Sequence, residues 1–446
     1  MATQVAALLY NRLTDEFNAR KHLRNGTPID HLTQVRNKAF DIFKAKGFPS
    51  VKEEDWRFTN LVPYLDAQFS INAVPSSEAH IQSVIEKVTI KGLDAYHLIL
   101  VNGSIHFAAS TLPDAAKMDI KTMQSVSNTD IFKTYNNTND HVGGNSIVAL
   151  NTAFFTDGYY LEVKQNAVLD KPIHIIHIYT TEENTFFQPR HLVVVNKFAK
   201  AEMIETSVAV KENGIVFVNS VSEVVVKENA WLTHHHVQNK NKNERWLHYY
   251  HVTQQQNSRY DNFTFSLPGA DLIRNNLEIT LDGTATETHL NGLYLVAGHQ
   301  LTDNHTAIEH KFPNCNSNEM YKGVLMESGK AVFNGKVFVD REAQKTNAFQ
   351  KNNNLLLSEK AQVFTKPQLE IFADDVKCSH GCTVGQFNPE SLFYLRSRGI
   401  GEDAARKLLV EAFMFDVTEK IDNEAVKKYV QNLIYQKMGS TSTIEN

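Results

Sequence analysis

The segment Asp374–Thr383 holds two thiols and an imidazole close together in sequence. On a β-strand, Cys378, His380 and Cys382 would point to one face, with neighbouring Cα atoms roughly 6.6 Å apart. Thiolate and imidazole are soft ligands that suit iron, copper or iron–sulfur species, and Gly381 could let the strand bend so that its ends approach. We therefore predict a metal or cluster site at these three residues. The alternative is that the cysteines are small buried hydrophobic residues.

A second candidate is a group of histidines: His234, His235, His236, His248 and His251. On a strand, His234 and His236 would share a face, and a neighbouring strand could present His248. Imidazole is the commonest metal ligand. However, no carboxylate is adjacent to any of these histidines in the sequence, and the nearby Lys240 and Lys242 disfavour a bound cation. We therefore expect a polar, exposed face here rather than a metal site.

Several motifs that would indicate an enzyme do not occur in the sequence. The P-loop pattern G-x-x-x-x-G-K-[ST] is missing, so the chain is not expected to hydrolyse ATP itself. The dinucleotide-binding, nucleophile-elbow and zinc-protease patterns are missing too. No C-x-x-C pair occurs, which argues against structural zinc or a redox dithiol. Cys315 lies in a loop-like stretch, where we expect it to have no special role.

The 446 residues carry a formal charge of −5 and are 42% apolar. This composition allows a large core and excludes a mainly disordered protein, and the mild acidity argues against nucleic-acid binding by bulk charge. Three cysteines are too few for a disulfide scaffold and point to a reducing compartment. Apolar runs such as Leu192–Val195 are far shorter than the ~20 residues of a membrane span, and no basic residue precedes the apolar stretch Ala6–Tyr10. We expect a soluble, cytoplasmic protein that binds neither nucleic acid nor membrane.

The N-terminal part predicts helices. Apolar residues recur every fourth position and form a stripe: Val5, Leu9, Leu13 and Phe17. A second helix is predicted to begin after the N-cap Asp30 and to end at Gly47. The pattern from 60 to 150 is mixed, with a strand at Ile99–Val101 that enters a turn.

Short strand-like runs, bounded by Gly, Asn, Asp or Lys, dominate from about residue 151 to 385. No helical pattern of 10–15 residues separates them, which argues against βαβ units. A turn with a small residue before the next strand recurs, as in Asn229-Ala230, Lys330-Ala331 and Lys360-Ala361. Many even, short strands of this kind favour a β-solenoid or a very large sandwich. In a solenoid, each coil buries its inward residues by stacking on its neighbours.

Helical patterns return after the strand-rich region. Asn388 is a good N-cap and Pro389 suits the first helical position. A further helix is predicted over 402–413, and Thr418 is predicted to cap a last one. The predicted organisation has three parts: an N-terminal helical and mixed region (1–150), a long β-region (151–385) and a C-terminal helical domain (386–446).

Two segments resemble one known family. The run from Asp374 to Ile400 contains Asp-Asp-Val-Lys-Cys-Ser-His-Gly, then Thr-Val-Gly and Leu-Phe-Tyr-Leu-Arg-Ser-Arg-Gly-Ile. It resembles the C-terminal signature of the SufB/SufD family, in its SufD-like version. The segment Glu53–Thr59 resembles the Glu-x-Trp-Arg-aromatic-Thr element near the N-terminus of the same family. The two segments occur in the expected order and, with the helix–β–helix layout, extend the resemblance to the whole chain.

The resemblance implies a mainly β fold, a right-handed parallel β-helix flanked by N-terminal and C-terminal α-helical domains. It also implies a non-enzymatic scaffold of the SUF iron–sulfur cluster assembly system. Such a scaffold would pair with a SufB-like paralogue through the β-helix, or form a homodimer in isolation. It would dock a SufC-like ABC-type ATPase on its C-terminal helices.

The resemblance also implies roles for individual residues. The family's functional pair at the assembly interface falls on Cys378 and His380, where a transient iron–sulfur cluster would be held. The family usually has a small residue at the position of Cys382, so the role of this third candidate ligand is open.

Two alternative functions are kept. The first is a SufB-type paralogue that is itself the principal cluster carrier, although such chains tend to have additional cysteines. The second is a metal-dependent or carbohydrate-active β-helix enzyme built on the histidine group. That enzyme would need a cleft with paired carboxylates or basic residues, and the sequence displays no such set.

Overall fold

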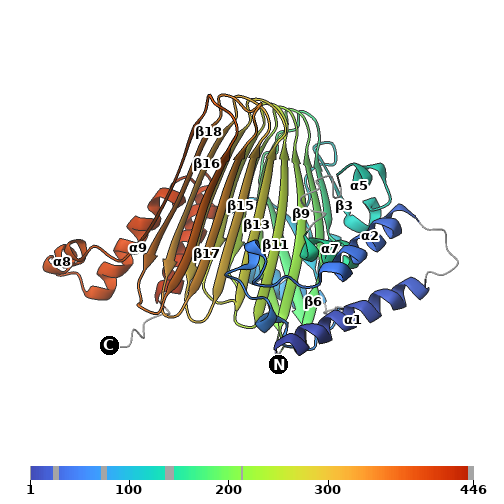
Figure 1. The fold of residues 1–446 in the computed structure, drawn as a ribbon, viewed down its shortest axis with the longest axis horizontal. Helices are drawn as coiled ribbons and strands as arrows, with labels where there is room; N and C mark the ends of the chain where they lie inside the picture. Colours follow the sequence, from blue (N-terminus) through green and yellow to red (C-terminus); the bar gives the residue numbers. More distant parts are fainter. Residues whose placement is uncertain (1, 24–29, 72–77, 136–144, 212–213, 440–446) are drawn as a thin grey trace.

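The computed structural model describes residues 2–23, 30–71, 78–135, 145–211 and 214–439. Most of the described chain forms a β-solenoid of two sheets, with helical segments before and after it (Figure 1). This confirms the predicted mainly β fold with flanking helices.

The two sheets are named here after their last strands. The β20 sheet has the order β2-β1-β5-β8-β10-β12-β14-β16-β18-β20. Its strands are β1 (Tyr96–Val101), β2 (Ser104–Ile105), β5 (Ile173–Thr181), β8 (Lys200–Lys211), β10 (Trp231–Gln238), β12 (Arg259–Ser266), β14 (Glu287–Val296), β16 (Asn316–Leu325), β18 (Asn347–Leu356) and β20 (Lys377–Gly385). The β19 sheet has the order β19-β17-β15-β13-β11-β9-β7-β4-β3, and β6 pairs with β9. Its strands are β3 (Met118–Thr122), β4 (Tyr159–Val163), β6 (Thr185–Phe187), β7 (Arg190–Val195), β9 (Val216–Val226), β11 (Glu244–Gln254), β13 (Leu272–Leu281), β15 (Leu301–His310), β17 (Lys330–Val339) and β19 (Gln362–Ile371).

Successive strands from β8 onward alternate between the two sheets, so each coil gives one strand to each sheet. The ladders between coils are parallel and continuous, as between β14, β16, β18 and β20. Antiparallel pairs occur at the other end, where β1 meets β2 and β3 meets β4. Immunoglobulin-like sandwiches are built from antiparallel sheets, so the parallel ladders decide in favour of the predicted parallel β-helix. The predicted strand at Ile99–Val101 is part of β1.

The turns between strands explain why Asn is frequent there. Asn166, Asn229, Asn257 and Asn314 have φ angles of 62°, 57°, 55° and 61°. Most residues avoid this left-handed region, whereas the short polar side chain of Asn tolerates it. Ala230 follows Asn229 and is only 1% exposed. The predicted small-residue turn therefore marks the point where the chain re-enters the interior.

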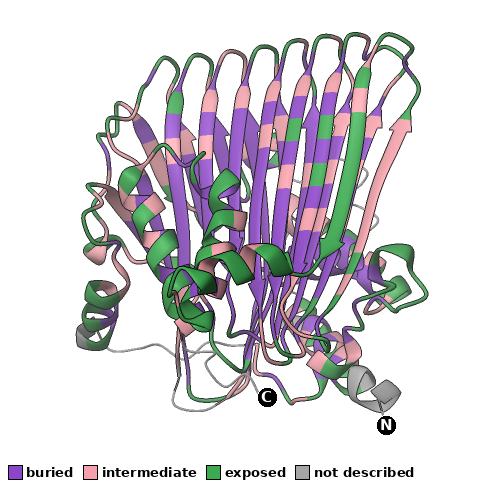
Figure 2. Ribbon diagram, turned by 90° about the vertical axis from the view of Figure 1, so that its left-hand side faces the viewer, coloured by how far each residue is buried: buried purple, intermediate pink, exposed green. Residues whose placement is uncertain are grey.

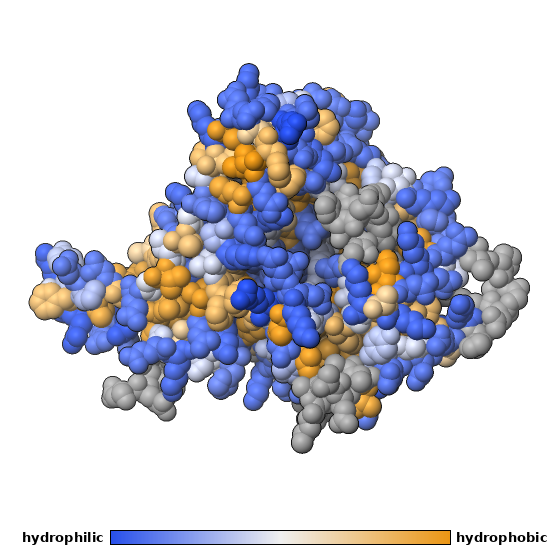
Figure 3. Space-filling view, in the orientation of Figure 1, coloured by the Kyte–Doolittle hydropathy of each residue, from blue (hydrophilic) through white to orange (hydrophobic). Residues whose placement is uncertain are grey.

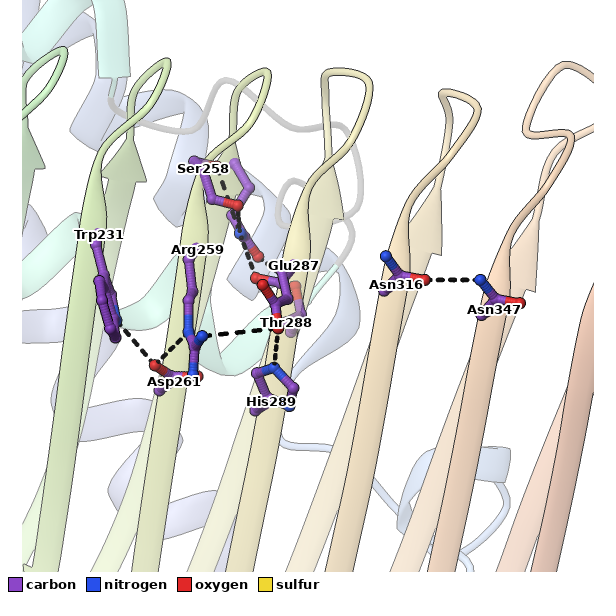
Figure 4. Close-up of polar contacts among 10 residues, drawn as sticks. Trp231, Ser258, Arg259, Asp261, Glu287, Thr288, His289, Asn316 and Asn347 are labelled. Carbon is purple, nitrogen blue, oxygen red and sulfur yellow. Dashed lines mark hydrogen bonds and ion pairs between the residues drawn. The ribbon is translucent and has the colours of Figure 1, made fainter. Parts of the chain in front are cut away.

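Outward-facing side chains form polar contacts within strands and between neighbouring coils. On the β20 sheet, the indole of Trp231 and the guanidinium Nε of Arg259 each donate to Asp261 Oδ2 at 2.8 Å (Figure 4). Asn347 donates to the side-chain oxygen of Asn316 on the adjacent strand, also at 2.8 Å. Cross-strand pairs of this kind stabilise a sheet and help to fix its register.

The described helices are α1 (Ala2–Leu23), α2 (His31–Lys46), α3 (Glu78–Val88), α4 (Met123–Val126), α5 (Asp130–Tyr135), α7 (Ser146–Phe154), α8 (Pro389–Ser397), α9 (Glu402–Thr418) and α10 (Glu424–Gly439), with the 3-10 turns η1 (Glu54–Trp56), η2 (Val62–Leu65) and η3 (Phe107–Ala109). α1 buries the predicted stripe residues Leu9, Leu13 and Phe17, and the side chain of Val5 lies outside the described residues. α7 is buried along its whole length and packs against α2.

The predicted ends of α2 are confirmed. The side chain of Asp30 accepts a hydrogen bond from the backbone N–H of Thr33 at 2.8 Å. At the other end, Gly47 has a φ of 68°, a conformation that favours glycine, and its N–H bonds to the carbonyl of Phe43.

α9 and α10 cover the outer face of the β20 sheet. Apolar residues of both helices pack in one cluster with Phe263, Leu293 and other outward residues of that sheet. Lys322 of β16 donates to the backbone carbonyl of Phe413 at 2.7 Å, which ties α9 to the sheet. Within the described ranges, no helix is long and apolar enough to cross a membrane.

The ends of the C-terminal helices confirm one prediction and correct another. Asn388 caps α8 by accepting from the backbone N–H of Glu390. The predicted cap at Thr418 is wrong, because Thr418 is the last residue of α9. The apolar stripe of α9 continues for another turn through the buried Val417, and Asn423 caps α10 instead.

Candidate functional site

The three candidate ligands on β20 share one face of that strand. They are in register with inward-facing residues of β18, whose side chains are buried: Ala348 with Cys378, Gln350 with His380 and Asn352 with Cys382. The inward-facing positions that are buried on β18 therefore continue onto β20, the strand of the last coil. Because β20 is the end of its sheet, no further strand among the described residues covers these side chains there. We call this the open end.

Exposure differs among the three side chains. Cys378 is half-buried and packs against a small apolar cluster that includes Val337 and Ala348, whereas His380 and Cys382 are exposed. Figure 2 shows the contrast: the strands of the solenoid body are mostly buried, and an exposed strand lies at one side of the array. Burial raises the pKa of the Cys378 thiol, and a backbone hydrogen bond from Ala348 opposes this. Deprotonation of Cys378 would therefore accompany metal binding.

The strand does not bring its ligands together by itself. β20 pairs with β18 from Lys377 to Gly385 without interruption, so Gly381 does not produce the bend that we considered. Among the described residues, no three or more His, Cys, Asp or Glu side chains are arranged to hold a metal ion. Any metal or cluster at Cys378 and His380 therefore needs ligands from outside this strand.

The interior behind the open end is unusually polar, and sequence reasoning missed it. Gln350 donates through Nε2 to Glu319 Oε2 at 2.7 Å, and Asn352 donates to the hydroxyl of Tyr294 at 3.0 Å. All four side chains are at most 3% exposed. The signal in the sequence was the coil length, since Gln350 and Glu319 are 31 residues apart and face the same way. Burial raises the pKa of Glu319 to about 7.

The prediction of an exposed histidine face is wrong. His234, His235, His236 and His248 are at most 4% exposed. Glu205 on the neighbouring strand β8 lies among them and contacts the Nε2 atoms of His177 and His234 at 3.1 Å each. Sequence distance concealed this carboxylate, because it comes from the preceding coil.

The buried histidines form a hydrogen-bonded part of the core. Burial lowers the pKa of His236 to about 3, so its ring is neutral. Its ring centroid lies 4.6 Å from that of His248, which comes from the opposite sheet rather than from a neighbouring strand. Within the described chain, this group has no arrangement that could hold a metal ion.

The segment Glu53–Thr59 docks on the outer face of the β19 sheet. Trp56 is 4% exposed, and the guanidinium of Arg274 lies 3.9 Å from its ring centroid. Arg274 is also paired with Asp303, which accepts a hydrogen bond from the hydroxyl of Thr59 at 2.5 Å. Burial alone would raise the pKa of Asp303, but Arg274 and its other partners lower it to about 2.

The same segment also reaches the last coil. Phe58 stacks on Phe364 of β19 with ring centroids 4.6 Å apart. Glu54 forms an ion pair with Lys366, two residues further along β19. We call these contacts, together with those of Trp56, the clasp.

A second exposed surface lies on the C-terminal helices. Large apolar side chains are exposed there: Phe393, Tyr394, Leu408, Phe415 and Tyr435. A groove between α9 and α10 is lined by the last three of them. In Figure 3, hydrophobic atoms gather toward the end of the molecule where these helices lie. Within the predicted Leu392–Arg398 motif, Phe393 is 73% exposed, so this side chain does not pack the domain's own core.

These features define a β-helical protein with helical appendages and a thiol–imidazole pair at its uncovered end. The chain belongs to the SufBD family of iron–sulfur cluster assembly proteins. The family model described as "SUF system FeS cluster assembly, SufBD core domain" matches residues 177–413, and "SufBD protein N-terminal region" matches residues 9–175.

Named relatives cover most of the chain. It is 33% identical over 409 residues to a SufBD family protein of Synechocystis, with 89% of each chain covered. It is 30% identical over 395 residues to the iron–sulfur cluster assembly protein SufD of Escherichia coli, covering 88% of this chain and 90% of the relative. The SufD protein of Bacillus subtilis is 27% identical over 300 residues, covering 67% of this chain and 68% of the relative.

Proposed function

We propose that this protein is a non-enzymatic, cytoplasmic scaffold subunit that holds a nascent iron–sulfur cluster between itself and a SufB-like paralogue. The observation that carries the proposal is the thiol and imidazole on one face of an uncovered strand. Two ligands do not complete a cluster, which usually has four protein ligands. The partner supplies the others, which is why the site is incomplete in this chain. The similarity to two SufD proteins favours this role over that of the SufB-type carrier.

The open end supports pairing with another β-helix. Pro367 lies in β19 and cannot donate a ladder hydrogen bond, so the edge of that strand is poorly suited to pairing. β20 contains no proline and offers a full edge for strand addition. Ile371, Phe372 and Val384 are exposed apolar residues of this last coil and the turn after β19. A homologous β-helix, or a second copy when that partner is missing, matches such an edge.

The C-terminal helices support docking of an ABC-type ATPase. The chain lacks a P-loop, so ATP hydrolysis belongs to another subunit. Exposed aromatic side chains beside arginine are typical of interface cores, and Arg398 lies 5.2 Å from the ring centroid of Tyr394. α8 has no buried residue and projects from the body, which leaves it accessible to a partner (Figure 1).

The test of the cluster site uses His380→Ala and Cys378→Ser, made separately in the full complex. Iron and acid-labile sulfide are measured after reconstitution, together with complex assembly by size-exclusion chromatography. We expect normal assembly and loss of most cluster. Ser379→Ala is the matched control, because Ser379 lies between the two ligands and points to the opposite face. Full cluster content in both site variants would overturn the proposal.

The test of ATPase docking uses Phe393→Asp and Phe415→Asp. Deleting residues 389–446 is unsuitable, because α9 and α10 cover apolar residues of the β20 sheet. We expect each point variant to weaken ATPase binding at least tenfold, measured by calorimetry. Phe198→Asp is the control, since Phe198 is 53% exposed in a turn of the solenoid and Phe415 is 55% exposed. Equal binding by all three variants would remove α8–α10 from the docking surface.

A further inference from the structure

Three side chains from three successive coils lie in one column behind the candidate cluster site. Glu319 of β16, Gln350 of β18 and His380 of β20 are in register. Glu319 and Gln350 are 3% and 1% exposed, and His380 is exposed at the open end. Adjacent strands of a sheet are roughly 4.8 Å apart, so a side chain on one coil can reach its neighbour on the next.

The amide of Gln350 is oriented by Glu319. Nε2 donates to Glu319 Oε2 at 2.7 Å, so the NH₂ group of Gln350 points toward the preceding coil. The space for this orientation comes from Gly335 on the opposite sheet, because a Cβ at that position would lie 2.3 Å from Gln350 Nε2. A protonated or an ionised carboxyl can accept this bond. The orientation therefore does not depend on the charge of Glu319, although burial raises its pKa to about 7.

The oxygen of the Gln350 amide is a buried acceptor that lacks a hydrogen bond. Among the described residues, Oε1 of Gln350 has no hydrogen-bond partner. Leaving such a group unsatisfied is costly, and native structures rarely do so without a reason. The nearest residue in register on the uncovered side is His380, whose imidazole carries an N–H donor.

We propose that Gln350 is a positioning residue for His380, whose ring N–H donates to Gln350 Oε1 when the other ring nitrogen binds metal, with Glu319 holding the amide in place. This inference rests on the proposed cluster site. A metal-bound histidine almost always donates its second N–H to a carbonyl or carboxylate, which fixes the tautomer and the orientation of the ring. In this chain the acceptor is supplied from inside the solenoid, so the imidazole would face outward toward the partner.

The experiment measures Co²⁺ affinity in the complex with the paralogous subunit, using the thiolate-to-Co²⁺ absorption band. Gln350→Leu removes the acceptor at similar volume, and we expect about 10–100-fold weaker binding. Glu319→Gln replaces the carboxyl with an amide that can accept or donate, so the Gln350 amide is no longer held in one orientation, and we expect a smaller loss. Gln350→Glu retains an acceptor and should restore most of the affinity. Asn354→Leu is the matched control, because Asn354 is a buried amide of the same strand, in register with Val384 rather than with a ligand.

The variant His380→Ala separates the two proposals. If it leaves Co²⁺ binding unchanged, the cluster site itself is wrong. If it weakens binding while Gln350→Leu behaves like Asn354→Leu, the cluster site stands and the role of Gln350 is overturned. Should Gln350→Leu fail to fold, the Glu319→Gln variant provides the test. The tautomer of His380 is then read by ¹⁵N-histidine NMR of the Zn²⁺-loaded complex. A tautomer unchanged from that of the unsubstituted complex would then contradict the proposal.

Discussion

The two segments with family-like sequences, Glu53–Thr59 and Asp374–Thr383, occupy opposite kinds of environment. In the first, Trp56 is buried, stacked on Arg274 and linked through Thr59 to Asp303. In the second, His380 and Cys382 are exposed on β20, and in the part of the chain that the structure describes no later coil packs on them. Both segments are rich in chemically capable side chains. The second leaves its thiol and imidazole side chains available to another molecule, whereas in the first the side chains of Trp56 and Thr59 are buried within the chain.

The comparison teaches that residue type alone does not separate a structural motif from a functional one. The clasp has its charges and aromatic faces matched within the chain, and it fastens the N-terminal part to β19 of the last coil. The clasp would therefore act on the proposed cluster site only through the stability of that coil. Variants of the two segments should accordingly separate stability from cluster binding.

The largest effect is expected in the clasp, for Arg274→Met. This change leaves Asp303, a fully buried carboxylate, without its cation, and breaking such a pair costs about 3–5 kcal/mol. The measurement is the free energy of unfolding from urea denaturation. The control is Lys336→Met, which breaks a pair with Glu370 whose side chains are 40% and 42% exposed, and such pairs contribute about 1 kcal/mol or less. Equal losses in the two variants would contradict the proposed importance of the clasp.

Two buried carboxyls are expected to make the free energy of unfolding depend on pH in opposite directions, with a smaller effect than Arg274→Met. The folded-state pKa of Asp303 is about 2, below the unfolded value of about 3.9, so its contribution is present above pH ~4 and is lost as the pH falls toward 2. The folded-state pKa of Glu319 is about 7, above the unfolded value of about 4.3, so its contribution is present below pH ~4 and is lost as the pH rises through 7. The change amounts to about 3 kcal/mol for Asp303 and up to about 4 kcal/mol for Glu319.

Unfolding free energies measured from pH 2 to 8 test this contrast. Asp303→Asn should flatten the acidic part of the profile, and Glu319→Gln should flatten the part between pH 4 and 7. The slopes are compared rather than the absolute values, because Asp303→Asn also leaves Arg274 without its partner. If the profile of either variant ran parallel to that of the unsubstituted chain, the assigned pKa direction would be wrong.

The fold was predictable because it depends on local signals that repeat. Asn229 and Ala230 mark a turn, and apolar runs such as Leu192–Val195 mark buried strands, so the residue pattern narrowed the fold to a solenoid or a large sandwich. The family resemblance then favoured the parallel β-helix. The end of α9 was missed because Thr418 has the chemistry of a cap, while the packing of Val417 on the sheet extends the helix.

The site was predictable only along one strand. Alternation placed Cys378, His380 and Cys382 on one face, and that face is the inward one. The residues that surround them are set by the register between coils, and they come from one or two coils earlier in the sequence. Glu205 beside His234, and Glu319 behind His380, were therefore hidden, because neither is near its neighbour in sequence.

A modest effect is expected for Phe58→Ala. Its ring stacks on Phe364 at 4.6 Å, but Phe58 is 41% exposed, so the loss should be about 1 kcal/mol. Phe349→Ala is the control, because Phe349 is 40% exposed on the last coils of the other sheet. Both variants are compared by thermal unfolding of the isolated chain. A loss no greater than that of the control would mean that the stacked pair does not hold β19.

The smallest effect is expected for Cys382→Ala. Cys382 is exposed, and Gly381 beside it has open space where a Cβ would be, so little packing is lost and stability should change by less than about 0.5 kcal/mol. Cluster content should fall less than for Cys378→Ser, because Cys378 packs against Ala348 and is the neighbour of His380 on the same face of β20. The two variants are compared by iron and sulfide content in the assembled complex. An equal or greater loss for Cys382→Ala would make the second thiol a principal ligand, and the pair Cys378–His380 would have to be extended to all three residues of the face.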